Sequence, residues 1–112
     1  MQELDNEKVY DLDTFRRGRD GVNNAEVYSS LFHRVTMWTV LEGNTLPLRG
    51  DVDAERILIV MGGMGKYTTA GVSRVIDDGM MVVAPPGVTY DIHNVDISPL
   101  VVLVVENMRE KR

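Results

Sequence analysis

The feature that most constrains the fold is the way glycine and proline divide the chain into short apolar runs. Asp77-Asp78-Gly79 is a tight-turn signal, and Pro85-Pro86-Gly87 ends a run because proline cannot donate to a strand ladder. The segments between these breaks are rich in β-branched and aromatic residues, and none has the length and period of an amphipathic helix. The expected strands are 28–41, 57–61, 66–69, 72–76, 80–83, 88–94 and 100–106. This pattern predicts an all-β barrel or sandwich with one core.

Polar segments flank the predicted strands at both ends of the chain. Residues 1–26 are dense in Asp, Arg, Gly and Asn, and they predict an irregular N-terminal extension that packs on the barrel, with one helical turn near Leu12–Arg17. Residues 27–106 form the predicted barrel, and residues 107–112 form a polar tail. The whole chain has 112 residues, which is the size of one domain.

Composition excludes several classes of function. The chain has no cysteine, which removes disulfides, thiolate zinc sites and cysteine nucleophiles. Its formal net charge of −5 argues against a nucleic-acid partner, because binding to phosphates needs a basic face. No stretch approaches the ~18 apolar residues of a membrane span, so no membrane partner is expected. The first residues lack the basic and apolar regions of a signal peptide, and the expected location is therefore cytoplasmic.

Two spaced motifs carry a resemblance to a known family. The first has the spacing Gly43-x5-Arg49-x-Asp51-x3-Glu55-x6-Gly62, and the second is Gly79-x5-Pro85-x-Gly87-x2-Tyr90-x3-Asn94. Except at the histidine positions, both follow the two motifs of cupins, and the chain resembles a small single-domain cupin of the conserved-barrel kind. The resemblance implies an all-β double-stranded β-helix, or jelly-roll, barrel. It also implies a homodimer, which the apolar run Leu100–Val105 supports because a small barrel has strand edges to cover.

In metal-binding cupins, the motif histidines and glutamate converge on one divalent metal. The resemblance places Arg49, Asp51, Glu55 and Tyr90 at these four positions, so these side chains are expected to meet inside the barrel. Arginine cannot be a ligand because it stays protonated and has no acceptor, and its charge repels a metal ion. We therefore expect no metal and no other cofactor. The alternative is a metal-dependent cupin enzyme with unusual ligands, in which Asp51 and Glu55 hold a hard cation and His33 is a ligand outside the motifs.

The same residues support more than one function. Arg49 is suited to hold a carboxylate or phosphate while Tyr90 and an acidic neighbour orient hydroxyls, which predicts metal-independent binding of a small anionic or sugar-like molecule. A second possibility is an isomerase, epimerase or lyase acting on a sugar or organic acid. Tyr90 would then be the acid and Glu55 or Asp51 the base. A third is a charge network that binds nothing. Catalysis ranks below binding, because a nearby Arg49 opposes the raised pKa that a carboxylate base needs.

The two histidines are expected on different faces. His33 shares a strand face with Val35 and Met37, and this face is expected to line the interior, which makes His33 a candidate ligand-binding residue. His93 lies three residues after Tyr90, so alternation points it to the opposite face as a surface or interface residue. Tyr67 follows the turn at residues 62–65 and is expected at the surface.

Overall fold

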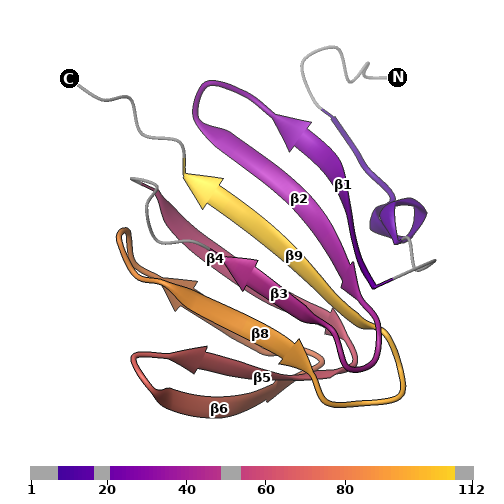
Figure 1. Ribbon diagram of the computed structural model, residues 1–112. Coiled ribbons are helices and arrows are strands. Elements are labelled where there is room, and N and C mark those ends of the chain that lie inside the picture. The colour runs from indigo at the N-terminus through magenta and orange to yellow at the C-terminus, as the bar shows by residue number, and fades with distance from the viewer. Residues whose placement is uncertain (1–7, 17–20, 49–53, 108–112) are drawn as a thin grey trace.

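The computed structural model describes residues 8–16, 21–48 and 54–107, and within them the chain forms strands and one short helical turn (Figure 1). The helical turn η1 is a 3-10 helix at Leu12–Phe15, close to the turn expected near Leu12–Arg17. The strands are β1 (Val22–Ser29), β2 (His33–Val40), β3 (Thr45–Leu48), β4 (Glu55–Gly62), β5 (Met64–Thr69), β6 (Val72–Asp77), β7 (Met81–Ala84), β8 (Tyr90–Asn94) and β9 (Leu100–Asn107). No helix in these ranges is long and apolar enough to cross a membrane.

The strands form two antiparallel sheets that face each other. The five-stranded sheet has the order β1-β2-β9-β4-β7, and the four-stranded sheet has the order β3-β8-β5-β6. Strands distant in sequence are therefore neighbours: β9 lies between β2 and β4, and β8 lies between β3 and β5 (Figure 1). The predicted all-β jelly-roll class is confirmed.

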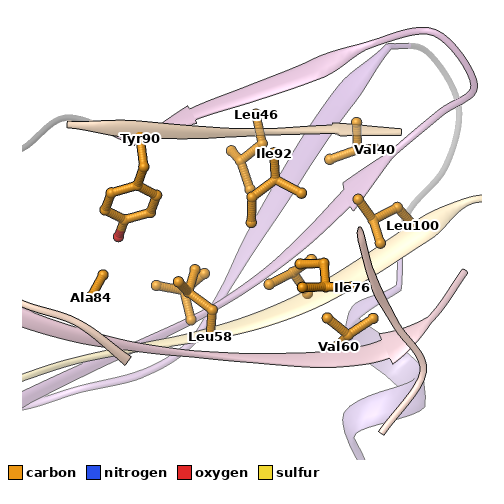
Figure 2. Packing of buried hydrophobic residues seen from close by; sticks show 11 residues of the cluster. Val40, Leu46, Leu58, Val60, Ile76, Ala84, Tyr90, Ile92 and Leu100 are labelled. Carbon is orange, nitrogen blue, oxygen red and sulfur yellow. The ribbon is translucent and has the colours of Figure 1, made fainter. Parts of the chain in front are cut away.

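The main core lies between the two sheets. Along β4, the side chains of Leu58 and Val60 alternate inward with period two, which is the spacing that a strand requires. They meet Leu46 and Ile92 from the facing sheet, as Figure 2 shows. The buried cluster consists of Val40, Leu46, Leu58, Val60, Ile76, Ala84, Tyr90, Ile92, Leu100, Val102 and Val104.

A second apolar cluster lies on the outer face of the five-stranded sheet. Val27, Met37, Val101 and Leu103 are buried there, partly under Leu12 and Phe15 of the N-terminal segment. The guanidinium of Arg16 donates a hydrogen bond to the carbonyl of Met61 at 3.3 Å, and the ring of Tyr10 lies 6.3 Å from that of Phe15. This part of the N-terminal extension therefore packs on the outer surface of the sheet.

The largest differences from the sequence prediction are at β1, β2 and β3. The expected strand 28–41 is two strands, β1 and β2, joined by a turn at residues 30–32. β1 begins at Val22, before the expected barrel start at Val27, because pairing with β2 outweighs the low strand propensity of Asn23 and Asn24. β3 was not predicted, since it contains Pro47. The structure places it at the edge of its sheet, where proline is tolerated.

Two glycines allow tight connections. Gly79 has a φ of +90° in the turn before β7, as its place in the Asp-Asp-Gly signal predicts. In the β4–β5 connection the left-handed residue is Gly63, with φ +84°, and not Gly62. A Cβ atom on Gly63 would lie 2.4 Å from the carbonyl oxygen of Pro99, so only glycine fits this close approach.

Candidate functional site

Charged side chains meet on the inner face of the five-stranded sheet, at one end of the core. Arg34 on β2 is paired in register with Glu106 on β9, which is paired with Arg56 on β4. Arg56 lies on the same strand face as the core residue Leu58, and Arg34 lies on that of Trp38. The Nε atom of Arg56 donates to a carboxylate oxygen of Glu106 at 2.8 Å, and Arg34 Nη1 lies 3.6 Å from the other oxygen. One carboxylate thus bridges two guanidiniums.

Two tyrosines complete this group from the four-stranded sheet. Tyr90 is the first residue of β8, and its ring points across the core toward Ala84 (Figure 2). Arg56 Nη1 donates a long hydrogen bond of 3.5 Å to the Tyr90 hydroxyl. The ring of Tyr67 on β5 lies 5.4 Å from that of Tyr90. Arg34, Arg56, Glu106, Tyr67 and Tyr90 are called the Arg–Glu–Tyr cluster below.

Exposure changes steeply across the cluster. The side chain of Arg56 is 8% exposed and that of Glu106 is 14% exposed, whereas that of Arg34 is 49% exposed. Arg56 and Glu106 are therefore held in the interior, while Arg34 lies where the interior meets solvent. A molecule arriving from solvent would meet the Arg34 guanidinium first.

The protonation states make the cluster a set of donors around one acceptor. Burial raises the pKa of the Tyr90 hydroxyl, although the hydrogen bond from Arg56 opposes this, and burial also raises the pKa of Tyr67. Burial tends to lower the pKa of Arg56. Its hydrogen bonds with Glu106 and Tyr90 outweigh that effect, so the pKa is raised. At neutral pH both phenols are protonated and Arg56 is a cation. Such groups recognise a carboxylate, a phosphate or a set of hydroxyls.

Of the four motif residues expected to meet, the structure describes two, Tyr90 and Glu55, and it separates them. Tyr90 is buried between the sheets. Glu55 is exposed at the start of β4, on the opposite face from its neighbour Arg56, so the expectation that Glu55 meets Tyr90 inside the barrel is wrong. Alternation explains the error, because a shift of one residue moves a side chain to the other face of a strand. Arg49 and Asp51 lie outside the described residues.

His33 does not line the interior, contrary to its prediction. It is the exposed first residue of β2 and shares its strand face with Met37, which belongs to the outer cluster. The inner face of β2 carries Arg34 and Trp38 instead. Both faces of β2 bury apolar residues, so alternation alone identified two faces but not which one points inward. His93 lies on the opposite face of β8 from Tyr90, as expected, and its Nδ1 lies 2.7 Å from the hydroxyl of Thr45.

Sequence reasoning missed Arg34, Arg56 and Glu106 as site residues. A signal was present in the sequence. Arg56 lies two residues before Leu58, and Glu106 lies two residues after Val104, so each charged side chain shares a strand face with buried apolar residues. The bridge between them depends on the pairing of β4 with β9, which are far apart in sequence. Tyr67, expected at the surface, is partly buried against the core.

The donor chemistry of the Arg–Glu–Tyr cluster does not fit a divalent metal. It offers one carboxylate, which is already paired with two guanidiniums, and a cation would be repelled by both. In the described part of the chain, no group of three or more histidine, aspartate or glutamate side chains is arranged to hold a metal ion.

Comparison with protein-family models and with curated proteins finds no match to this sequence. The fold, however, is similar to several solved structures. An uncharacterized conserved protein with a double-stranded β-helix domain from Klebsiella pneumoniae matches with a TM-score of 0.82 and 16% identity, over 90% of each chain. The Cnp3 cupin domain of Schizosaccharomyces pombe has a TM-score of 0.80 at 12% identity, over 90% of this chain and 74% of that one. A Cupin 2 conserved barrel domain protein from Salinispora arenicola has a TM-score of 0.73 at 18% identity, over 89% of this chain and 87% of that one. The chain therefore has the cupin fold, the double-stranded β-helix of a small barrel domain.

Proposed function

We propose that the protein binds a small anionic or sugar-like molecule at the Arg–Glu–Tyr cluster, without a metal. The observation that carries the proposal is the inward-facing row of Arg34, Glu106 and Arg56, opposite Tyr90 in the facing sheet. Buried charges are costly unless they are paired, and this row combines an interior pair with a half-exposed guanidinium at its solvent end. Such an arrangement suits recognition of a ligand that enters from that end.

Arg34 is the proposed anchor of the ligand. Its guanidinium has five N–H donors in a planar fork, and the ion pair to Glu106 is 3.6 Å long, which is beyond ordinary hydrogen-bond length. A ligand carboxylate or phosphate can take the outer edge of this fork through two parallel hydrogen bonds. The protonated phenols of Tyr67 and Tyr90 supply further hydroxyl donors on the inner side of the bound anion. Glu106 holds Arg34 and Arg56 in place.

The experiment is a thermal-shift screen of the full chain with organic acids, sugars and sugar phosphates. A ligand at 100 times its dissociation constant is expected to stabilise the fold by about 2.7 kcal/mol. Arg34→Gln is expected to abolish the shift. Lys66→Gln removes the same charge from an exposed position on the outer side of β5 and is expected to leave the shift unchanged. A shift that persists in Arg34→Gln, or no shift with any compound, would contradict the proposal.

Catalysis ranks second because the cluster supplies an acid, whereas its one carboxylate, Glu106, is already paired with two guanidiniums. The protonated Tyr90 hydroxyl is suited to donate a proton, as an isomerase, epimerase or lyase would need. Glu55, one of the two candidate bases, faces away from Tyr90. Asp51, the other, lies outside the described residues. If a substrate is identified, unchanged turnover in Glu55→Gln would show that Glu55 is not the base.

We propose that two copies of the chain associate through the outer face of the five-stranded sheet. Cross-strand pairing makes two rows on this face that contain no charge: Tyr28, Val35, Val105, Ile57 and Val83, and Ala25, Met37, Leu103, Ile59 and Met81. The N-terminal segment covers the β1 side, whereas Met81 and Val83 on β7 are 60% and 51% exposed. A twofold contact brings the same patch of both copies together, so a face without charges, which has no like charges to repel each other, suits a second copy. A monomer mass in sedimentation at micromolar concentration would contradict this.

A further inference from the structure

The turn between β1 and β2 holds two large apolar side chains in solvent. Leu31 is 86% exposed and Phe32 is 68% exposed. The Ser30 hydroxyl oxygen accepts hydrogen bonds from the backbone N–H groups of Phe32 and His33 at 3.0 and 3.1 Å, so the backbone of the turn is fixed by its own contacts. Adjacent exposed apolar residues on an ordered turn indicate a surface that something covers.

The turn lies at the same end of the molecule as the Arg–Glu–Tyr cluster. His33, the first residue of β2, pairs with Asn107, and the next pair in the ladder is Arg34 with Glu106. Phe32 lies in the turn, two residues before Arg34, so the chain holds their Cα atoms within about 7 Å of each other. A ligand group bound at Arg34 is therefore within reach of the apolar side chains of the turn.

The charge of Glu106 determines how a ligand bound at Arg34 is oriented. Arg34 has the carboxylate of Glu106 on its inner side, at 3.6 Å from Nη1. A ligand with a second negative charge would place that charge against Glu106 or in solvent, whereas a monoanion satisfies Arg34 without this repulsion. The uncharged remainder of a monoanion then extends away from Glu106, along the turn that carries Leu31 and Phe32.

We infer that the ligand is a monocarboxylate with an apolar tail, held by Arg34 at its carboxylate and covered by Leu31 and Phe32 along its tail. This inference rests on the proposed function and names the ligand class of that same site. The apolar turn is the specificity-determining part, and Arg34 is the anchor. Phosphates and underivatised sugars are expected to bind more weakly, because they cannot cover the apolar turn.

Calorimetric titration of the full chain with acetate, butanoate, hexanoate and octanoate tests the inference. Affinity is expected to rise about two- to fourfold for each methylene group that the tail buries. Phe32→Ser and Leu31→Ser are expected to flatten this dependence on length, whereas Ile97→Ser, also an exposed apolar residue (78%) but at the opposite end of β9, leaves it unchanged. Hexanamide, the neutral analogue, is expected to bind about tenfold more weakly than hexanoate.

Each other outcome separates the inference from the proposed function. Equal affinity along the acid series, or a length dependence that survives Phe32→Ser, overturns the inference and leaves the proposed function standing. Binding of a sugar phosphate through Arg34, with no binding of any monocarboxylate, likewise overturns the inference and leaves the proposed function standing. Loss of a protein–protein contact in Phe32→Ser, with acid binding intact, assigns the turn to a protein partner and overturns the inference. If no compound of any class binds, the proposed function fails as well.

Discussion

Glu55 and Arg56 are adjacent on β4, yet their environments are opposite. Glu55 is exposed, whereas the Arg56 side chain is 8% exposed and donates to Glu106 at 2.8 Å. The contrast follows from strand geometry, since consecutive side chains leave opposite faces of a sheet. The charged residue that lies in the interior is therefore Arg56. The motif residue Glu55 is exposed, so a substitution of Glu55 serves as a control for substitutions in the buried pair.

We expect Glu106→Gln to destabilise the fold by about 3 kcal/mol, because it removes the charge that compensates the buried Arg56 guanidinium. Glu55→Gln is expected to change the free energy of unfolding by less than about 0.5 kcal/mol, since Glu55 is exposed. Urea denaturation at pH 7 measures both variants. Equal effects of the two substitutions would show that Glu106 and Arg56 do not form a buried pair.

Tyr90 predicts a loss of stability at alkaline pH. Burial raises the pKa of its hydroxyl above the value in the unfolded chain, 10.0, because the protonated form is favoured in the interior. Its contribution to stability is therefore complete below about pH 10 and is lost as pH rises through the folded-state pKa. Tyr90→Phe is expected to lose less stability than the native chain between pH 8 and pH 11, as measured by denaturation. The same slope in both proteins would contradict this.

Among the strands, sequence pattern predicted β4, β6 and β9 well. The ranges 57–61, 72–76 and 100–106 fall within β4, β6 and β9, because their dense β-branched residues favour strands regardless of context. β1 and β3 depend on partners instead, since asparagines or a proline lower their own propensity. The direction of each face was not predictable in β2, where both faces are apolar. This ambiguity is the physical reason that His33 was assigned to the interior.

The β4–β5 connection makes a prediction about glycine. Gly63→Ala is expected to cost about 3 kcal/mol or more, because a strained positive φ is combined with a Cβ position 2.4 Å from the Pro99 carbonyl oxygen. Gly79→Ala is the matched control: its φ is +90°, but nothing lies within 4 Å of the added carbon, so the expected cost is about 1 kcal/mol. Urea midpoints of the two variants provide the comparison. If Gly63→Ala is as stable as Gly79→Ala, the Pro99 carbonyl does not approach Gly63 this closely.

For the whole molecule, the spacing of glycines and prolines was sufficient to predict the cupin fold, but the site was only partly predictable. Tyr90 is part of the Arg–Glu–Tyr cluster, whereas none of its other members stands at a fixed position of the two motifs. The glycines and prolines of the two motifs determine where the chain turns, and the turns determine which strands pair. Which charges meet in the interior depends on how β2, β9 and β4 are aligned, and this alignment is a long-range property.

The outer face of the five-stranded sheet tests the proposed association of two copies. β7 is an edge strand among the described strands, and its outward residues Met81 and Val83 continue the two apolar rows. We expect the native chain to sediment as a dimer and the double variant Met81→Asp, Val83→Asp as a monomer. In the variant, a twofold contact would bring like charges together in an apolar interface.

Ile97→Asp is the matched control for that experiment, because Ile97 is 78% exposed in the β8–β9 connection and lies outside both rows. It is expected to leave the dimer intact. Both β7 positions are solvent-facing in one chain, so the double variant should fold, and a retained far-ultraviolet circular dichroism spectrum checks this. A dimer that survives the two β7 charges but is lost with Ile97→Asp would move the contact to the other end of the barrel.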